Sequence, residues 1–186
     1  MKHVDVWYEM VERNISLGLI LEDDPIFVPF FKEKFNRVIY TAIRTGALKL
    51  NRPCLDRSQR KISGNEWFNQ EPMFVVGTCL EMFSHLFPRG KPDAQPMLTT
   101  SKGNASRCAH AYVITSCAAK AMIDTIAQYP TNTDTPDFFL NFVYRHSNVL
   151  QSFWIDPPIV YQGNHIIDLE HVETYNGSMY NKDFGK

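Results

Sequence analysis

The chain has 186 residues, 44% of them hydrophobic, which is typical of one globular domain and argues against a disordered segment. Its 19 basic and 20 acidic residues give a net charge of -1, and no basic stripe indicates a nucleic-acid partner. The apolar runs are far too short to span a membrane, so we expect no transmembrane segment.

The first part of the chain predicts two helices on either side of one strand. Apolar residues recur at helical spacing over residues 3–14, which indicates an amphipathic helix. Residues 16–21, "SLGLIL", are apolar on both faces, as in the buried strands of parallel sheets. After three consecutive carboxylates, Pro29 opens a second amphipathic helix. Residues 46–71 are polar without a clear period and predict a long irregular loop.

The middle of the chain repeats this alternation. Residues 73–79, "MFVVGTC", predict a second buried strand. Residues 84–106 are rich in Pro, Gly, Ser and Thr and predict another irregular connection. Residues 108–115, "CAHAYVIT", predict a third strand, and Ser116 is expected to cap the helix that follows it.

The last part contains one more helix and one more extended segment. Pro136 starts a short helix, residues 150–163 predict an extended segment, and residues 166–186 form a polar tail without a clear pattern. Because strands and helices alternate along the whole chain, we expect a single α/β domain over residues 1–186. We expect it to have a layered fold with a mostly parallel sheet.

The four cysteines do not predict a metal site. None of them forms a CxxC pair, so the spacing excludes a zinc ribbon. Buried thiols are the simplest interpretation, and disulfides remain open if the protein is secreted. The cysteines are Cys54, Cys79, Cys108 and Cys117.

The three carboxylates that end the first strand are the most informative polar group. Glu22, Asp23 and Asp24 repel one another when ionised. Either water screens them in a surface turn that leads into Pro25, or a divalent cation lies among them. In open α/β sheets, ligands bind beyond the carboxyl ends of the strands, which is where these residues lie.

Five segments resemble, in their order along the chain, glycosyltransferase family 25, which includes lipooligosaccharide and procollagen galactosyltransferases. The resemblance covers residue 3 to about residue 165 and implies a GT-A-like (Rossmann-like) fold, a UDP-sugar donor and Mn²⁺ or Mg²⁺. The segments are "HVDVW", "LILEDDPIF", "CAHAYVITSCAAKAMID", "PDFFL" and "WIDPPIVYQG".

The resemblance also implies roles for single residues. The acidic cluster corresponds to the family's DxD-like metal motif, with Asp24 on the metal, Glu22 and Asp23 beside it and His165 as a further ligand. Asp137 corresponds to the base that takes the proton of the acceptor hydroxyl. By position alone, Asp137 is equally a carboxylate in the first turn of a helix.

Four further residues are candidates for contacts with the donor or the substrate. His110 and Tyr112 lie two apart on a strand and are expected to face the donor or acceptor hydroxyls. Gln162 is expected to contact phosphate or sugar, and Trp154 to stack on a sugar ring. Ordinary burial in the core is the alternative for His110, Tyr112 and Trp154.

The function expected from these features is metal-dependent transfer of a hexose, galactose in the first instance, from a nucleotide sugar to a glycan or protein hydroxyl. The alternative is a non-catalytic carbohydrate-binding or assembly module with the same fold. A metal-dependent phosphohydrolase or nuclease is a third interpretation, but it would need more carboxylates spaced along the chain.

Members of the family normally carry further strands before the helix that begins here, so we expect an N-terminally truncated domain. Missing strands would expose a sheet edge, which predicts a homo-oligomer or a marginally stable monomer. Without a visible signal sequence the chain is expected in the cytoplasm. If its N-terminus is incomplete, the lumen of the endoplasmic reticulum or Golgi is expected instead.

Overall fold

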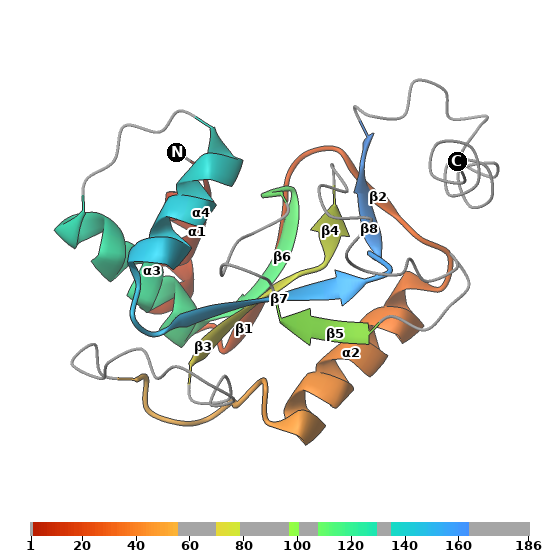
Figure 1. Cartoon of the computed structure of the whole chain (residues 1–186), viewed down its shortest axis with the longest axis horizontal. Coiled ribbons are helices and arrows are strands. Elements are labelled where there is room, and N and C mark those ends of the chain that lie inside the picture. Colours follow the sequence, from red (N-terminus) through yellow and green to blue (C-terminus); the bar gives the residue numbers. More distant parts are fainter. Residues whose placement is uncertain (1, 56–69, 79–96, 101–107, 130–134, 164–186) are drawn as a thin grey trace.

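The computed structural model of the chain describes residues 2–55, 70–78, 97–100, 108–129 and 135–163 (Figure 1). Four helices and eight strands lie in this part of the chain. The helices are α1 (Lys2–Glu12), α2 (Phe31–Thr45), α3 (Ser116–Gln128) and α4 (Pro136–His146). The strands are β1 (Leu17–Leu21), β2 (Pro25–Phe27), β3 (Glu71–Val75), β4 (Gly77–Thr78), β5 (Met97–Thr100), β6 (Ala111–Thr115), β7 (Leu150–Asp156) and β8 (Val160–Gln162).

The strands form two sheets, and the larger one is mostly antiparallel. Its order is β1-β6-β3-β7-β5, and only the β3–β7 pair is parallel. The smaller sheet has the order β2-β8-β4. The fold is therefore mixed α/β, as expected, but the prediction of a mostly parallel sheet is wrong.

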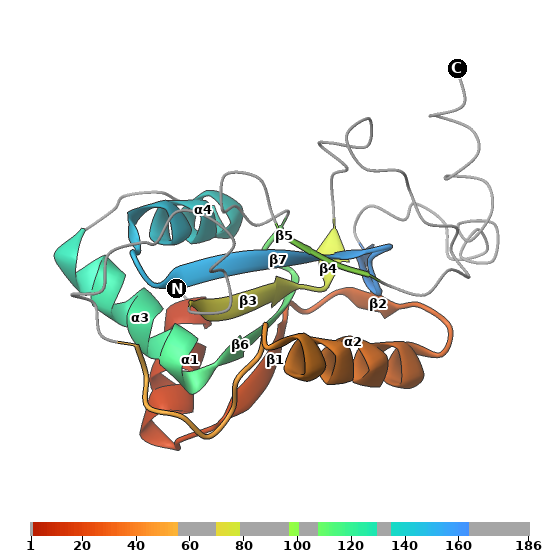
Figure 2. The ribbon, with the colours of Figure 1, turned by 60° about the horizontal axis from the view of Figure 1, so that its bottom comes forward.

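The strand direction was mispredicted because both faces of the large sheet are buried. One core cluster packs α1, α3 and α4 against Met73 and Val75 of β3. A second cluster packs α2 against Phe74 and the following Val76, on the opposite face. Figures 1 and 2 show α1, α3 and α4 grouped together, away from α2. Two covered faces give continuous apolar strands whatever the strand direction, so the sequence pattern does not report direction.

Several predicted boundaries change for local reasons. The strand expected over residues 73–79 is divided at Val76, whose N–H still donates to Ala111 of β6 but whose carbonyl accepts from Ile159 and Val160. The connection expected over residues 84–106 contains β5. The cap of α3 is Thr115, whose hydroxyl accepts from the Ala118 N–H at 3.0 Å, rather than Ser116.

The residues that follow α2 are held at the end of the large sheet where β3 begins. Arg52 lies 3.0 Å from the carboxylate of Glu71, which also accepts from the Leu55 N–H at 3.0 Å. A disulfide joins Cys54 to Cys117 in α3, and Cys108 is also disulfide-bonded. The interpretation of the cysteines as buried thiols is therefore wrong for these three. Their Sγ atoms are close enough to bond only because the fold brings distant segments together.

β1 lies at one edge of the large sheet, with β6 as its neighbour among the described residues. An edge strand is a place where another chain can associate, and the homo-oligomer stays a prediction. Within the described residues, none of the helices has the length and apolar character needed to cross a membrane. The polar tail over residues 166–186 lies outside the described residues.

Candidate active site

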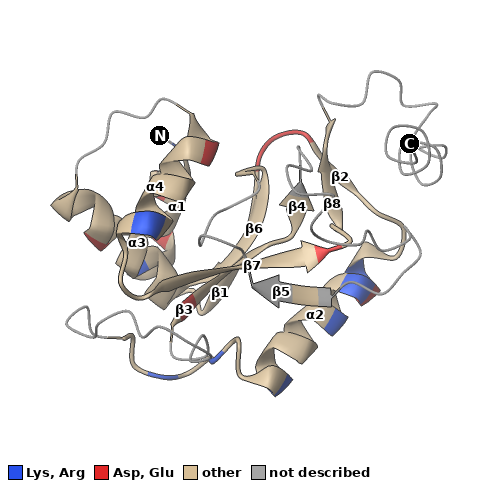
Figure 3. Cartoon of the chain, viewed as in Figure 1, with Lys and Arg blue, Asp and Glu red and all other residues tan. Residues whose placement is uncertain are grey.

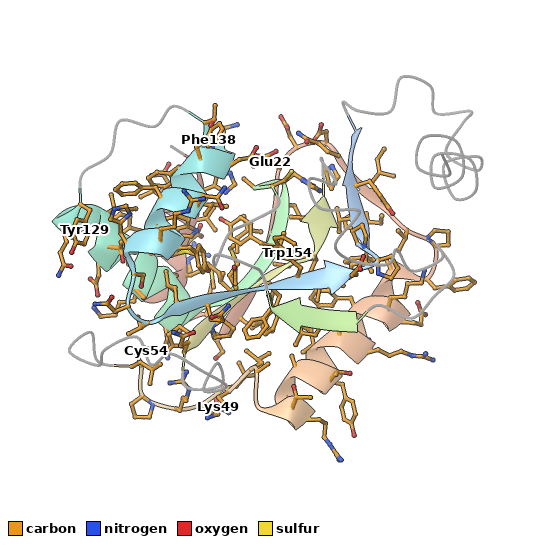
Figure 4. All side chains as sticks on the ribbon, in the orientation of Figure 1. Glu22, Lys49, Cys54, Tyr129, Phe138 and Trp154 are labelled. Carbon is orange, nitrogen blue, oxygen red and sulfur yellow. A yellow bond between two sulfur atoms is a disulfide. The ribbon has the colours of Figure 1, made fainter. Side chains whose placement is uncertain are left out.

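A pocket of about 420 Å³ opens at the carboxyl end of β1. Figure 4 shows Glu22 at this end of the sheet, close to the start of α4. The lining comes from the start of α1, the end of β1 with its acidic turn, and the start of α4. The lining residues are Lys2, His3, Val6, Ile20, Leu21, Glu22, Asp23 and Pro136.

The segment before β6 fixes two of the predicted carboxylates. The N–H of Glu22 donates to the carbonyl of His110 at 2.9 Å, which extends the β1–β6 ladder by one residue. The N–H of the adjacent Ala109 donates to Oδ1 of Asp137 at 2.5 Å. Two neighbouring residues thus hold Glu22 and Asp137 at the same end of the sheet, as their predicted roles require.

Burial and like charges act in the same direction on Glu22. Burial raises the pKa of Glu22 above its usual range, and the nearby Asp137, Asp24 and Asp23 raise it further. In Figure 3 the acidic turn appears as the red segment between β1 and β2. A bound cation would stabilise the ionised form of Glu22 beside these carboxylates.

Behind Glu22, three buried side chains lie in contact. Nε2 of His3 is 3.5 Å from Oε1 of Glu22, and Nδ1 of His3 is 3.0 Å from the hydroxyl of Tyr112. The indole N–H of Trp7 donates to the same hydroxyl at 3.0 Å. Burial lowers the pKa of His3 despite the nearby Asp137 carboxylate, and burial raises the pKa of Tyr112 far above its usual range. Tyr112 therefore lies beneath the pocket wall.

The segments that carry Asp24 and Gln162 lie side by side at the end of the smaller sheet. Gln162 is paired with Pro25, and the N–H of Gly163 donates to the carbonyl of Asp24 at 2.8 Å. A Cβ on Gly163 would lie only 2.8 Å from that carbonyl oxygen, so the close approach requires glycine. The two segments that resemblance placed at one site are thus adjacent in space.

The other two candidate residues are buried away from this pocket lining. His110 is 1% exposed, and its Nε2 lies 3.4 Å from the carbonyl of Val160; a Cβ on Gly77 would overlap its ring. Trp154 is also 1% exposed and lies in the middle of the sheet (Figure 4). This burial favours packing roles for both rings over contacts with a sugar.

The carboxylates fit a divalent cation only in part. Within the described ranges, no group of three or more His, Cys, Asp or Glu side chains is arranged to hold a metal ion. His165 lies outside the described residues. However, Mg²⁺-type sites often use one or two protein carboxylates and complete the shell with phosphate oxygens and water. Glu22 and Asp23, both in the pocket lining, supply hard oxygen donors of that kind.

Sequence reasoning did not assign site roles to Lys2, His3 or Trp7. His3 and Trp7 are four residues apart, one turn of α1, so they share a face of the helix. The apolar periodicity of residues 3–14 indicated that this helix buries one face. Nothing in the sequence showed that the face would meet Tyr112, which is 109 residues from His3.

Comparison with known proteins identifies the family. A comparison with curated proteins returned no match. The family model for glycosyltransferase family 25, described as LPS biosynthesis protein, matches residues 1–136, which is 136 of the 186 residues. The matched range includes the acidic turn and all of the pocket lining, and it ends one residue before Asp137. The chain belongs to glycosyltransferase family 25.

Proposed function

We propose that this chain transfers a hexose, galactose in the first instance, from a UDP-sugar to a hydroxyl of a glycan or protein, with Mn²⁺ or Mg²⁺ bound at the acidic turn. The observation that carries this proposal is the convergence of Glu22, Asp23, His3 and the start of α4 on one pocket of about 420 Å³ in a chain of this family. Pockets of this size are typical of small-molecule sites.

The acidic turn supports the metal part of the proposal. Glu22 and Asp23, which line the pocket, would hold the cation, and Asp24, which the resemblance put on the metal, would lie beside it. When bound, the cation supplies Lewis-acid stabilisation of the diphosphate that leaves. Lys2, also in the lining, adds a positive charge that can attract the diphosphate.

Asp137 is the proposed base. Its Oδ1 is held by the Ala109 N–H, so proton transfer from the acceptor hydroxyl would use Oδ2. Its influence on the pKa values of Glu22 and His3 supports a position close to the pocket. With the site at the carboxyl end of β1, we also retain the GT-A-like arrangement as part of the proposal.

Calorimetry with Mn²⁺ and UDP-galactose tests this function. We expect wild-type protein to bind UDP-galactose only with Mn²⁺, and Glu22→Gln to lose most of that binding. Asp137→Asn should bind the donor normally but lose transfer by 100-fold or more, on the order of a general-base contribution. Asp124→Asn is the matched control, because Asp124 makes an exposed pair with Lys120 on α3.

Two outcomes would contradict the proposal. Wild-type protein that binds no UDP-sugar with or without Mn²⁺ would exclude it. Glycan binding that is unchanged in both Glu22→Gln and Asp137→Asn would favour the non-catalytic carbohydrate-binding module instead.

For the compartment, we propose an oxidising lumen rather than the cytoplasm. Cys54, Cys108 and Cys117, the cysteines in the described part of the chain, are all disulfide-bonded. Structural disulfides persist in secreted and lumenal proteins and are rare in the reducing cytosol. This supports the endoplasmic reticulum, Golgi or an equivalent oxidising space as the place where the chain folds.

A further inference from the structure

Four side chains form a series that leads from the core to the pocket. The series begins at Trp7 in α1, passes through Tyr112 in β6 and His3, and ends at Glu22 after β1. Trp7 and Tyr112 are 0% exposed, and the side chain of His3 is 9% exposed, whereas that of Glu22 is 26% exposed. Only the last member of the series therefore presents a substantial surface to a ligand.

The donors and acceptors in this series fix the protonation of the histidine ring. The Trp7 indole can only donate, so the Tyr112 oxygen accepts from it. Tyr112 is buried, and its hydroxyl proton needs an acceptor, which Nδ1 of His3 provides at 3.0 Å. A neutral imidazole that accepts at Nδ1 carries its proton on Nε2. That N–H is the group on the side of Glu22 Oε1, 3.5 Å away.

We propose that His3 is a positioning residue for Glu22, locked in its Nε2–H tautomer by the buried Tyr112 hydroxyl, and that Trp7 holds this hydroxyl in place. The inference rests on the proposed function, because Glu22 is positioned for the cation and diphosphate of that reaction. It reassigns Tyr112, which acts through His3 rather than on the donor. Partners that orient a ligating side chain often change metal affinity by about 10- to 100-fold when removed.

The ring geometry supports a fixed histidine. The His3 and Tyr112 rings are stacked, with centroids 5.7 Å apart, and the ring of Trp7 stacks on Phe139 of α4. These contacts restrict rotation of the imidazole. A ring flip would put Cδ2 opposite the Tyr112 hydroxyl and Cε1 opposite Glu22, and would therefore break both contacts at once. His3 therefore presents a fixed N–H to Glu22.

The first test measures the tautomer directly, without metal or activity. Protein labelled with ¹⁵N-histidine gives long-range proton–nitrogen correlations that distinguish the two neutral tautomers, and His3→Asn identifies the His3 signals among the six histidines. We expect the pure Nε2–H pattern in the wild type. Tyr112→Phe, which removes only the hydroxyl, should convert His3 to a mixture. An Nδ1–H pattern in the wild type, or no change in Tyr112→Phe, would overturn the inference.

The second test measures Mn²⁺ affinity by calorimetry in the presence of UDP. His3→Asn keeps a polar atom near the position of Nδ1 but cannot reach Glu22, whereas His3→Gln can place an amide N–H near the position of Nε2. We expect His3→Asn and Tyr112→Phe to weaken Mn²⁺ binding by about tenfold or more and His3→Gln to recover most of it. A structural role alone would weaken both His3 variants equally, and melting curves identify any variant that fails to fold.

The outcomes separate this inference from the function on which it rests. If wild-type protein binds no Mn²⁺ with UDP, the proposed function fails, and the positioning role fails with it even if the tautomer is as expected. If wild-type protein binds Mn²⁺ and His3→Asn binds it equally well, only the positioning role fails. Loss of binding in His3→Asn with recovery in His3→Gln supports both.

Discussion

Two glutamates at opposite ends of the large sheet show how a carboxylate whose pKa is raised by burial can serve structure or function. Burial raises the pKa of both Glu22 and Glu71. At Glu71 the Leu55 N–H and Arg52 counteract that shift, and the carboxylate is fully paired in the fold. At Glu22 the neighbouring carboxylates add to it. A buried carboxylate with partners on both oxygens is part of the fold, whereas one surrounded by like charges is a candidate place for a ligand.

The surroundings of Glu71 supply the largest predicted effect. The Cys54–Cys117 disulfide spans 63 residues of sequence and fixes the segment that carries Arg52. The double variant Cys54→Ser/Cys117→Ser should lose about 4 kcal/mol of unfolding free energy by the loop-closure estimate. Urea unfolding measures this. Lys120→Gln, on the exposed side of the same helix, is the control and should cost under about 0.5 kcal/mol. A loss no larger than the control's would contradict a structural role for the disulfide.

Removing the partner of Glu71 should have the next largest effect. Arg52→Ala leaves a carboxylate that is 2% exposed without its cation and should cost about 3 kcal/mol in urea unfolding at neutral pH. Arg13→Ala removes an exposed pair with Glu9 and should cost under about 1 kcal/mol. If both arginines cost the same, Glu71 is not held by Arg52.

The cost of Arg52→Ala should also depend on pH. Because the folded pKa of Glu71 lies above its ordinary value of 4.5, the folded state binds the proton more tightly than the unfolded state. The stability that this difference in proton binding contributes is therefore fully present below pH 4.5, and it is lost as pH rises through the folded pKa of Glu71. Without Arg52 that pKa rises further, so the variant and wild type should converge in acid and separate toward neutral pH.

Neutralising Glu22 should have the smallest effect on stability, and of opposite sign. In the presence of EDTA, Glu22→Gln removes a charge that Asp23, Asp24 and Asp137 repel, so its melting temperature should rise slightly. Glu71→Gln should lower it, because Arg52 loses its ion pair. Differential scanning calorimetry of the two variants compares the two ends of the sheet. If both variants change the melting temperature in the same direction, the contrast between Glu22 and Glu71 is wrong.

The local patterns in the sequence predicted most elements. Apolar periodicity predicted α1 and α2, and Pro136 predicted the start of α4. Strand direction could not be predicted, because it depends on which segments pair, and both faces of this sheet are covered. β5 was missed because a four-residue edge strand lacks a periodic signal of its own.

The sequence by itself determined the family and the acidic turn at the end of β1, because the family depends on the order of motifs along the chain and the turn on adjacent residues. Only the tertiary structure decided what surrounds that turn. It brought Asp137 to Glu22 through Ala109, placed Tyr112 beneath His3, and paired Cys54 with Cys117. The physical reason is that hydrogen bonds, ion pairs and disulfides act over a few ångströms, while their partners here lie far apart in sequence.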